Sequence, residues 1–355
     1  MKEYNVIGIM SGTSLDGVDL AHCYFSKDDS GWKFEIKDCI TIEYNPQWKK
    51  KLSALHTLDA QTFANTHAEY GHYLGLLVKE FVVENNLKID FVSSHGHTVF
   101  HQPQHIFTSQ IGDGAAISAE CGLPVACDFR SKDVALGGQG APLVPIGDKF
   151  LFSEYDFCLN LGGIANISFD LEKKRIAFDI CPCNMVLNYY SKFLGKEYDD
   201  EGKFASQGKL NASLFDNLNS LPFYTIHSQK SLGRENIETD FFPVLNSSEA
   251  SDQDKLNTMC EHIAFQISSV TRASKPQTAN HKLLITGGGA FNKFLVSRIK
   301  ELSGVEIVIP SETIIKYKEA LIFAFLGVLR WRGEVNSLKS VTGARVDSVG
   351  GAVYL

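Results

Sequence analysis

Three stretches of the sequence have residue types and spacings that suit the binding of a phosphate. Residues 8–19 read GIMSGTSLDGVD and contain three glycines, three hydroxyl groups and two carboxylates. Glycine lacks a Cβ, so the backbone N–H groups of such a turn can approach a ligand closely, and converging N–H groups and hydroxyls favour an anion. Two later turns share this character, NLGGIAN at 160–166 and ITGGGAFN at 285–292. The second of these joins a buried strand to a helix, whose N-terminus has a partial positive charge.

Together the three turns predict a nucleotide site. For any single turn the alternative is a tight turn without a ligand, and that alternative stays open. The chain has neither a GxxxxGK[ST] loop nor a GxGxxG loop, so these two phosphate-binding motifs are not the explanation.

A histidine-rich segment gives a second hypothesis. Residues 94–105 read SHGHTVFHQPQH and contain four histidines. On an extended segment His95 and His97 would share one face, and Asp113 and Asp128 could complete a zinc site. A zinc hydrolase is therefore an alternative to a nucleotide enzyme.

Length and composition restrict the class of protein. A chain of 355 residues exceeds the usual size of one hydrophobic core, so we expect two domains. The formal net charge of −7 argues against general nucleic-acid binding, which needs clustered Lys and Arg. We expect no secretory signal and no membrane span. Eight scattered cysteines are typical of reduced thiols in a cytoplasmic protein.

The hydrophobic pattern occurs in two copies: a strand, a glycine turn, a strand, a third strand, and then helices. The strands of the first copy are expected at 4–10, 18–25 and 33–44, and those of the second at 156–161, 165–170 and 175–180. A long amphipathic helix follows Asp59, and a further strand is expected at 89–94. In the C-terminal half, strands at 282–286 and 305–309 alternate with helices at 254–273, 291–302 and 311–331, which indicates an α/β fold.

A glycine- and proline-rich segment, SKDVALGGQGAPLVPIG, interrupts regular structure after residue 130. We place the crossing between the domains there. The expected N-terminal lobe is residues 1–131 with about 338–355, and the expected C-terminal lobe is 132–337.

Five segments resemble successive signatures of the anhydro-N-acetylmuramic acid kinase family. They are GIMSGTSLDGVD, SHGHTVFH, ACDFRSKDVALGGQGAPLVP, LNLGGIANIS and TGGGAFN, and they follow the family's order over nearly the full chain. The resemblance implies the sugar kinase, Hsp70 and actin fold class, with two ribonuclease-H-like (actin-like ATPase) domains and an ATP cleft between them. It implies that 1,6-anhydro-N-acetylmuramic acid, ATP and water give N-acetylmuramate 6-phosphate and ADP, in peptidoglycan recycling in a bacterial cytoplasm. It also suggests a homodimer.

The resemblance places the ATP phosphates against the first two glycine turns and the adenosine near the third. The residues expected to bind ATP are Gly12, Thr13, Ser14, Leu15, Asp16, Gly17, Val18, Asp19, Gly162, Gly163, Asn166, Gly287, Gly288 and Gly289. Mg²⁺ is expected to bridge the β- and γ-phosphates, with Asp16 and Asp19 as direct or water-mediated contacts. The alternative for Asp16 is a turn-forming side chain.

The reaction needs a base that deprotonates water for attack at C1, and Asp179 matches the family's catalytic aspartate. The sugar is expected to contact His97, Thr98, Asp113, Arg130 and Glu319, which fall in the family's sugar-binding segments. The fork of Arg130 suits the lactyl carboxylate, although it could instead hold Asp128 or Asp133. Glu319 could equally be a charge on a helix face.

The chain departs from the family pattern around Asp179. The family typically reads FDTGPGN, whereas residues 178–184 here read FDICPCN. Two added Cβ atoms could reshape the sugar pocket or forbid a turn of positive φ. The C-x-C pair has no second ligand pair, so we interpret Cys181 and Cys183 as small buried thiols rather than a metal or redox site. A nucleotide-binding module without catalysis is a third hypothesis.

Overall fold

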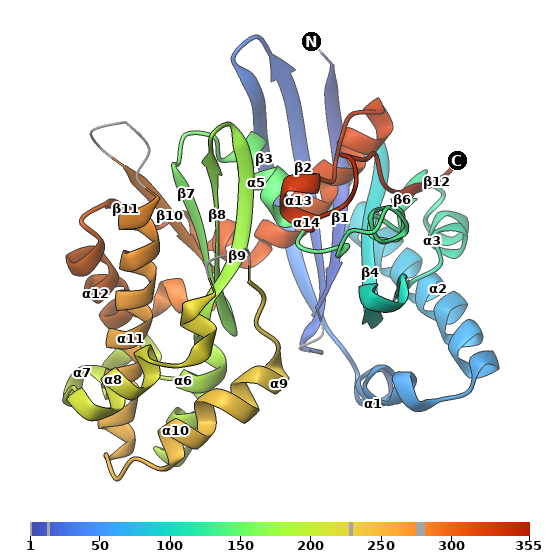
Figure 1. The fold of residues 1–355 in the computed structure, drawn as a ribbon. Helices are drawn as coiled ribbons and strands as arrows, with labels where there is room; N and C mark the ends of the chain where they lie inside the picture. Colours follow the sequence, from blue (N-terminus) through green and yellow to red (C-terminus); the bar gives the residue numbers. More distant parts are fainter. Residues whose placement is uncertain (1, 13–14, 227–229, 275–280) are drawn as a thin grey trace. The chain divides into compact units, whose positions relative to one another are not determined.

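The structure is a computed structural model that describes residues 2–12, 15–226, 230–274 and 281–355. The chain divides into two compact units: unit 1 is Met1–Leu151 with Tyr317–Leu355, and unit 2 is Phe152–Lys316. Each unit contains a mixed sheet with helices, so the predicted α/β fold with two domains is confirmed (Figure 1). None of the helices in the described part of the chain is long and apolar enough to cross a membrane.

Unit 1 contains a seven-stranded sheet in the order β12-β6-β4-β1-β2-β3, with β5 paired to β4. Its first three strands form an antiparallel meander, and β1, β4 and β6 are parallel. The strands are β1 (Glu3–Ser11), β2 (Gly17–Asp28), β3 (Gly31–Glu43), β4 (Phe91–Gln102), β5 (Phe107–Ile111), β6 (Val125–Cys127) and β12 (Ala352–Tyr354).

Unit 2 contains a five-stranded sheet in the order β11-β10-β7-β8-β9. Here β7, β8 and β9 form the antiparallel meander, and β7, β10 and β11 are parallel. The strands are β7 (Phe157–Leu161), β8 (Ile164–Leu171), β9 (Lys174–Pro182), β10 (Lys282–Thr286) and β11 (Glu306–Val308). Read from the third strand of the meander, the order is β3-β2-β1-β4-β6 in unit 1 and β9-β8-β7-β10-β11 in unit 2, so the duplication expected from the hydrophobic pattern is confirmed.

The helices of unit 1 cover both faces of its sheet. Helix α2 begins where expected, because the Asp59 carboxylate accepts a hydrogen bond from Thr62 N–H, and it packs Tyr70 and Leu74 against Ile7 and Ile9 of β1. The helices are α1 (Pro46–Ala54), α2 (Ala60–Glu84), α3 (Gly114–Cys121), α4 (Ser131–Ala135), α5 (Val144–Leu151), α14 (Lys339–Thr342) and most of α13 (Glu312–Arg332), with 3₁₀ turns at Leu55–Thr57 and Pro103–His105.

The helices of unit 2 surround a second core, in which α11 packs beside α12 (Figure 1). They are α6 (Asn184–Phe193), α7 (Lys203–Gln207), α8 (Ala212–Asn219), α9 (Arg234–Asn236), α10 (Phe242–Asn246), α11 (Asp252–Ala273) and α12 (Lys293–Ser303). Single turns of 3₁₀ or π helix occur at Asp200–Gly202, Pro222–Thr225, Ile237–Phe241 and Gly288–Phe291.

The division of the chain differs from the expected one, because residues 132–151 and 317–337 belong to unit 1. Helix α13 packs so closely on β1 that a Cβ at Gly8 would overlap the backbone oxygen of Ala320. The segment after Arg130 is fixed by the buried Asp133 carboxylate, which accepts hydrogen bonds from Gly140 N–H (2.8 Å) and the Ser337 hydroxyl (2.7 Å). Glycine and proline therefore mark an ordered loop of unit 1 here.

Candidate nucleotide and sugar site

Two of the three glycine turns meet within unit 2. Strands β7 and β10 are parallel neighbours, so their carboxyl ends lie at the same edge of the sheet. Asn184, at the start of α6, joins the turns: its N–H donates to Gly162 O (3.1 Å) and its side-chain amide donates to Leu161 O (2.8 Å). The same side chain is the nearest neighbour of Gly288. The structure thus brings Gly162, Gly163 and Gly287–Gly289 together, although their contact with ATP stays a prediction.

Four of the five glycines of these turns form two pairs that differ in what the fold requires of them. Gly287 has φ +80°, and a Cβ there would lie 2.8 Å from the Leu161 carbonyl carbon. A Cβ at Gly289 would lie 2.6 Å from the Leu161 Cβ. A Cβ at Gly163 or Gly288, in contrast, would come no closer than 3.7 Å to any neighbour, and neither residue has a positive φ. The fold therefore explains Gly287 and Gly289, whereas Gly163 and Gly288 leave space that a ligand can fill.

The hydrogen bonds of the 162–163 turn also suit an anion. The carbonyl groups of Gly162 and Gly163 accept hydrogen bonds from the N–H groups of residues 183–185 at the start of α6. Among the described residues, the N–H groups of these two glycines donate to no backbone carbonyl outside the strand pairing. Backbone N–H groups that remain available at a glycine turn are the groups that cradle a phosphate.

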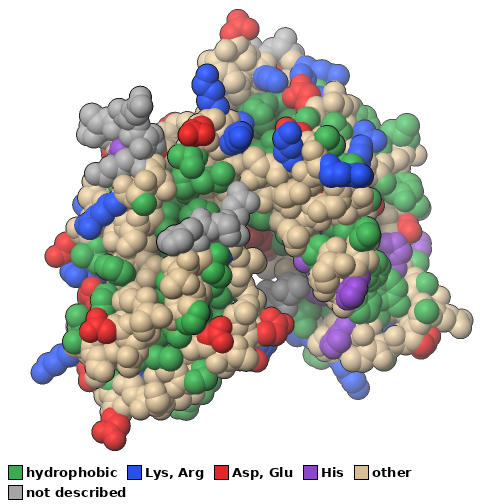
Figure 2. All heavy atoms as spheres, in the orientation of Figure 1, with side chains coloured by type: hydrophobic (Ala, Val, Ile, Leu, Met, Phe, Trp, Pro, Cys, Tyr) green, Lys and Arg blue, Asp and Glu red, His purple; other side chains and the backbone are tan. Residues whose placement is uncertain are grey.

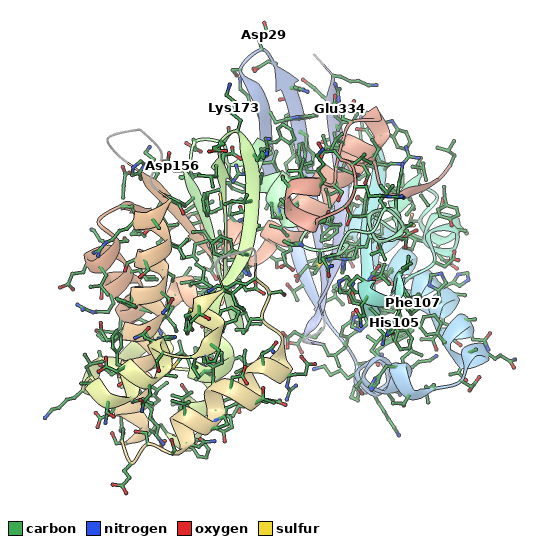
Figure 3. All side chains as sticks on the ribbon, viewed as in Figure 1. Asp29, His105, Phe107, Asp156, Lys173 and Glu334 are labelled. Atoms are coloured by element: carbon green, nitrogen blue, oxygen red, sulfur yellow. The ribbon has the colours of Figure 1, made fainter. Side chains whose placement is uncertain are left out.

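Asp179 lies near the carboxyl end of β9, far along the strand from Lys173, which Figure 3 labels in the β8–β9 turn. Its Oδ2 accepts hydrogen bonds from Leu232 N–H (2.8 Å) and from the Ser231 hydroxyl (3.3 Å). Burial raises the pKa of the Asp179 carboxyl above its usual value, while these two hydrogen bonds lower it. Across the sheet Asp179 pairs with Asn166 of β8, so these two expected site residues lie side by side.

The first glycine turn connects β1 to β2 in unit 1. Thr13 and Ser14 lie outside the described residues, so the structure says nothing of their predicted roles. Leu15 adopts φ +61°, and the side chain of Val18 packs in the core of unit 1, so only its backbone could face a ligand. A Cβ at Gly17 would overlap Ile42 O, which gives this glycine a role in the fold itself.

Two carboxylates of this turn fit a divalent cation. Asp16 is exposed, and Asp19 is half-buried and accepts a hydrogen bond from the Thr41 hydroxyl (2.6 Å). Burial raises the pKa of Asp19, and the neighbouring charge of Asp16 adds to that rise. Mg²⁺ commonly binds one or two carboxylates together with the phosphates of its nucleotide, so this pair suits the ion when ATP is present.

The expectation that His95 and His97 share a face is wrong. Gly96 adopts φ +71°, and the pairing of β1 with β4 shifts register at this point. The bulge turns the two rings to opposite faces of the sheet: His95 packs on Phe323 of α13 (ring centroids 4.4 Å apart), and His97 packs on Tyr70 of α2 (6.2 Å). Regular two-residue alternation, on which the expectation depended, ends at a β-bulge.

The zinc alternative finds no support at His95. The Arg130 guanidinium donates to His95 Nε2 through Nε (3.1 Å) and Nη2 (3.0 Å), and guanidinium N–H groups can only donate. His95 is therefore neutral, with its proton on Nδ1, which donates to Gly96 O (2.9 Å). Burial lowers the pKa of His95 well below its usual value, and the Arg130 charge lowers it further. The lone pair of Nε2, which would ligate zinc, is thus already used by the Arg130 guanidinium.

The other two histidines of the segment lie elsewhere. His101 and His105 are exposed, and Figure 3 shows His105 with Phe107 at the turn between β4 and β5. Figure 2 shows histidine side chains on the surface of this part of unit 1. Across the four described ranges, no group of three or more His, Cys, Asp or Glu side chains is arranged to hold a metal ion.

A small cavity of about 250 Å³ lies in unit 1 among the expected sugar-binding segments. Its walls include His95, Gln110 and Asp128, together with Gly112 and Gly114, the two neighbours of Asp113. The Asp113 carboxylate accepts a hydrogen bond from Ala116 N–H and so begins α3, with His67 Nε2 3.5 Å away. Thr98, also expected to bind sugar, accepts a hydrogen bond from Gln110 Nε2 (3.3 Å).

Arg130 contacts neither of the acidic partners considered for it, because it donates to His95 and, through Nη1, to Gly140 O (2.7 Å). Two of its five N–H groups make no hydrogen bond to the described residues and remain available for a carboxylate. Burial lowers the pKa of Arg130 to about 10, whereas the Glu319 and Asp133 charges raise it. Glu319 lies on α13 within reach of this charge; burial among its neighbours raises the pKa of its carboxyl, and Arg130 lowers it.

Cys181 and Cys183 are buried in the core of unit 2, which confirms their interpretation as small buried thiols. Burial raises the pKa of Cys183 to about 12, so the thiol stays protonated. Sequence reasoning missed the linking role of Asn184 and the contacts of Ser231 and Leu232 with Asp179. The retained Asn184 in FDICPCN was the one signal for the first, and no pattern pointed to the second.

The comparisons of sequence agree on one family. The sequence model of a family described as anhydro-N-acetylmuramic acid kinase matches residues 4–355. A protein of that name from Sulfurimonas denitrificans is 33% identical over 379 residues, covering 100% of both chains. One from Mannheimia succiniciproducens is 35% identical over 382 residues, covering 100% of this chain and 99% of the relative. Among solved structures, the activator of 2-hydroxyisocaproyl-CoA dehydratase from Clostridium difficile, with bound ADPNP, has a TM-score of 0.44 at 13% identity and covers 92% of this chain and 97% of its own.

Proposed function

The chain belongs to the anhydro-N-acetylmuramic acid kinase family, and we propose that Asp179 is the general base with which this ATP-using kinase opens its sugar. Water attacks C1 of 1,6-anhydro-N-acetylmuramic acid and gives its proton to Asp179. The C1–O6 bond breaks, and O6 takes the γ-phosphoryl group of ATP. The products are N-acetylmuramate 6-phosphate and ADP.

The hydrogen bonding of Asp179 is the observation that supports this role most directly. Leu232 N–H and the Ser231 hydroxyl both donate to Oδ2, so the orientation of the carboxylate is fixed. Within the described part of the chain no donor contacts Oδ1, which is therefore available to accept a proton. Burial raises the pKa of this carboxyl, which makes it a stronger base than an exposed aspartate.

The remaining site residues are proposed to bind the two substrates. The 162–163 turn and Gly288 receive the nucleotide in unit 2, because they combine available N–H groups with open space. In unit 1, Asp16 and Asp19 would hold the Mg²⁺ that neutralises charge on the phosphates. The two available N–H groups of Arg130 suit the lactyl carboxylate, and Glu319 lies near this arginine to balance its charge.

Water competes with the sugar for the γ-phosphoryl group of ATP unless it is excluded, so we expect the protein to close on its bound substrates. We expect small-angle scattering to show compaction when a non-hydrolysable ATP analogue and the sugar are both added. Because this kinase uses ATP, we expect the reaction to take place in the cytoplasm.

The test is ADP release with 1,6-anhydro-N-acetylmuramic acid as the sole acceptor. General-base catalysis typically contributes about 10²- to 10⁴-fold, so Asp179→Asn should lower kcat by that factor and leave ATP binding intact. Asp216→Asn, which changes an exposed aspartate on α8, is the matched control and should keep full activity. An Asp179→Asn enzyme that retained most of its rate would remove Asp179 from the reaction.

A further inference from the structure

We propose that a closed ring of three hydroxyl groups fixes the tautomer of His97, so that its unprotonated Nε2 accepts a hydrogen bond from an O–H or N–H group of the sugar. The hydroxyls belong to Ser11, Tyr44 and Tyr70. This inference rests on the proposed function, because it assigns the donor to the sugar. Ser11, Tyr44 and Tyr70 are then positioning residues, which act through His97.

The ring is assembled from three elements of unit 1. Ser11 ends β1, Tyr44 follows β3 and Tyr70 lies on α2. Ser11 Oγ lies 2.6 Å from Tyr44 OH and accepts a hydrogen bond from Tyr70 OH (2.9 Å), and the two tyrosine hydroxyls are hydrogen-bonded to each other. All three side chains are buried, so water does not replace any of these contacts.

Counting protons settles the direction of every bond. Three oxygen atoms make three mutual contacts, and each hydroxyl supplies a single hydrogen. A contact without a hydrogen would place two lone pairs against each other, so all three hydrogens are used inside the ring. Because Tyr70 donates to Ser11, Ser11 donates to Tyr44 and Tyr44 donates to Tyr70.

The fourth contact of this cluster determines the state of His97. Its Nδ1 lies 3.1 Å from Ser11 Oγ. The only hydrogen of Ser11 already points to Tyr44, so the hydrogen in this contact must come from His97 Nδ1. Ser11 Oγ then donates one hydrogen bond and accepts two, which uses its full capacity. A neutral imidazole with its proton on Nδ1 has a lone pair on Nε2.

The surroundings keep every group in the state that this count assumes. Burial lowers the pKa of His97 to about 4, so the ring is neutral at physiological pH. Burial also raises the pKa values of Tyr70 and Tyr44, so their hydroxyls keep their protons. His97 Nε2 makes no hydrogen bond to the described residues. Side-chain nitrogen and oxygen atoms that are fully enclosed without a partner do occur in this structure, but His97 Nε2 is not one of them. The small exposed part of the ring therefore includes this atom.

The consequence is a selective contact in the middle of β4, beside the Gly96 bulge. An Nε2 lone pair attracts a hydroxyl or amide N–H of the sugar and repels an ether oxygen or a carboxylate. His95, the residue directly before Gly96, has the same tautomer for a different reason, because its Nε2 already accepts hydrogen bonds from Arg130. Of these two rings, His97 is the one whose lone pair remains available.

The test is the ¹⁵N spectrum of histidine-labelled protein, with steady-state kinetics of the same samples. Wild type should show a protonated Nδ1 and an unprotonated Nε2 for His97, assigned by the loss of its signals in His97→Gln. Tyr70→Phe opens the ring and leaves one hydroxyl hydrogen free to point at His97 Nδ1, so the Nε2–H tautomer should appear. The KM for the sugar should rise about 3- to 10-fold, the effect of one weakened hydrogen bond, while the KM for ATP stays unchanged.

Tyr73→Phe is the matched control, because Tyr73 lies on the same helix and packs against both ring tyrosines without a hydrogen bond to the cluster among the described residues. It should leave the spectrum and both KM values as in wild type. A protonated Nε2 in wild type would overturn the proposal, as would a Tyr70→Phe enzyme with wild-type spectrum and KM. The spectra need neither sugar nor turnover, so a wild type with the expected tautomer but no ATP-dependent product would refute the proposed function instead.

Discussion

The nucleotide turns of unit 2 allow the effect of a glycine on folding to be separated from its effect on binding. Gly163→Ala places a Cβ whose nearest neighbour is Met185 Cε at 3.7 Å, an ordinary contact. Gly289→Ala places one 2.6 Å from Leu161 Cβ, a distance that real Cβ atoms essentially never show. The two substitutions are chemically identical and lie in adjoining turns, so each serves as the control for the other.

The expected magnitudes follow from these distances. Gly163→Ala should leave the free energy of unfolding unchanged or raise it by up to about 1 kcal/mol, because alanine restricts the unfolded chain. If the N–H groups of this turn bind phosphate oxygens, the added methyl group displaces those oxygens from the turn. Losing one charge-assisted hydrogen bond costs about 1.5–3 kcal/mol, which weakens ATP binding about 10- to 150-fold. Gly289→Ala should lower the free energy of unfolding by about 1–3 kcal/mol through overpacking.

Denaturant unfolding measures the free energy of unfolding of both variants, and calorimetric titration measures their affinity for ATP. A Gly163→Ala protein that is as stable as wild type but binds ATP with unchanged affinity would show that the nucleotide does not contact this turn. A Gly289→Ala protein with wild-type stability would refute the steric argument itself.

Three further substitutions test other parts of the structure. Asp179 must be ionised to act as a base, so kcat/KM should fall as the pH drops through its raised pKa. The Ser231 hydroxyl donates a hydrogen bond that lowers this pKa, so Ser231→Ala should move the acidic limb of the pH profile to higher pH. Gly8→Ala should destabilise unit 1 by at least ~3 kcal/mol in denaturant unfolding, because α13 must move off β1. Cys183→Gly should cost ~2 kcal/mol of stability through a lost buried side chain and a freer backbone, and should leave the KM for the sugar within about threefold of wild type.

Local pattern was sufficient to predict the two meanders. In each copy, apolar strands flank a polar glycine turn, and both features depend on neighbouring residues alone, so the expected strands at 18–25 and 165–170 overlap β2 and β8. The cap at Asp59 was predictable for the same reason, since the carboxylate bonds a backbone group three residues away.

Features that depend on distant contacts were not predictable. The allocation of α13 to unit 1 depends on Gly8 meeting Ala320, more than 300 residues along the chain. The opposite faces of His95 and His97 depend on Gly96, whose backbone approaches the carbonyl of Ile111 so closely that a Cβ would lie 2.5 Å from it. From sequence, Gly96 is one glycine in an otherwise alternating strand, and alternation predicts a shared face.

The departure FDICPCN can now be judged on the structure rather than on the family pattern. None of Ile180, Cys181 and Cys183 has a positive φ, so the turn does not require the glycines that the family has there. All three side chains are buried in the core of unit 2, where they pack among apolar neighbours. The register of β8 and β9 shifts between Asn166 and Ala165, and the extra residue on β9 is Ile180. This bulge lets Asp179 pair with Asn166 while Ile180 and Cys181 both lie in the core of unit 2, so the altered residues are accommodated within the core.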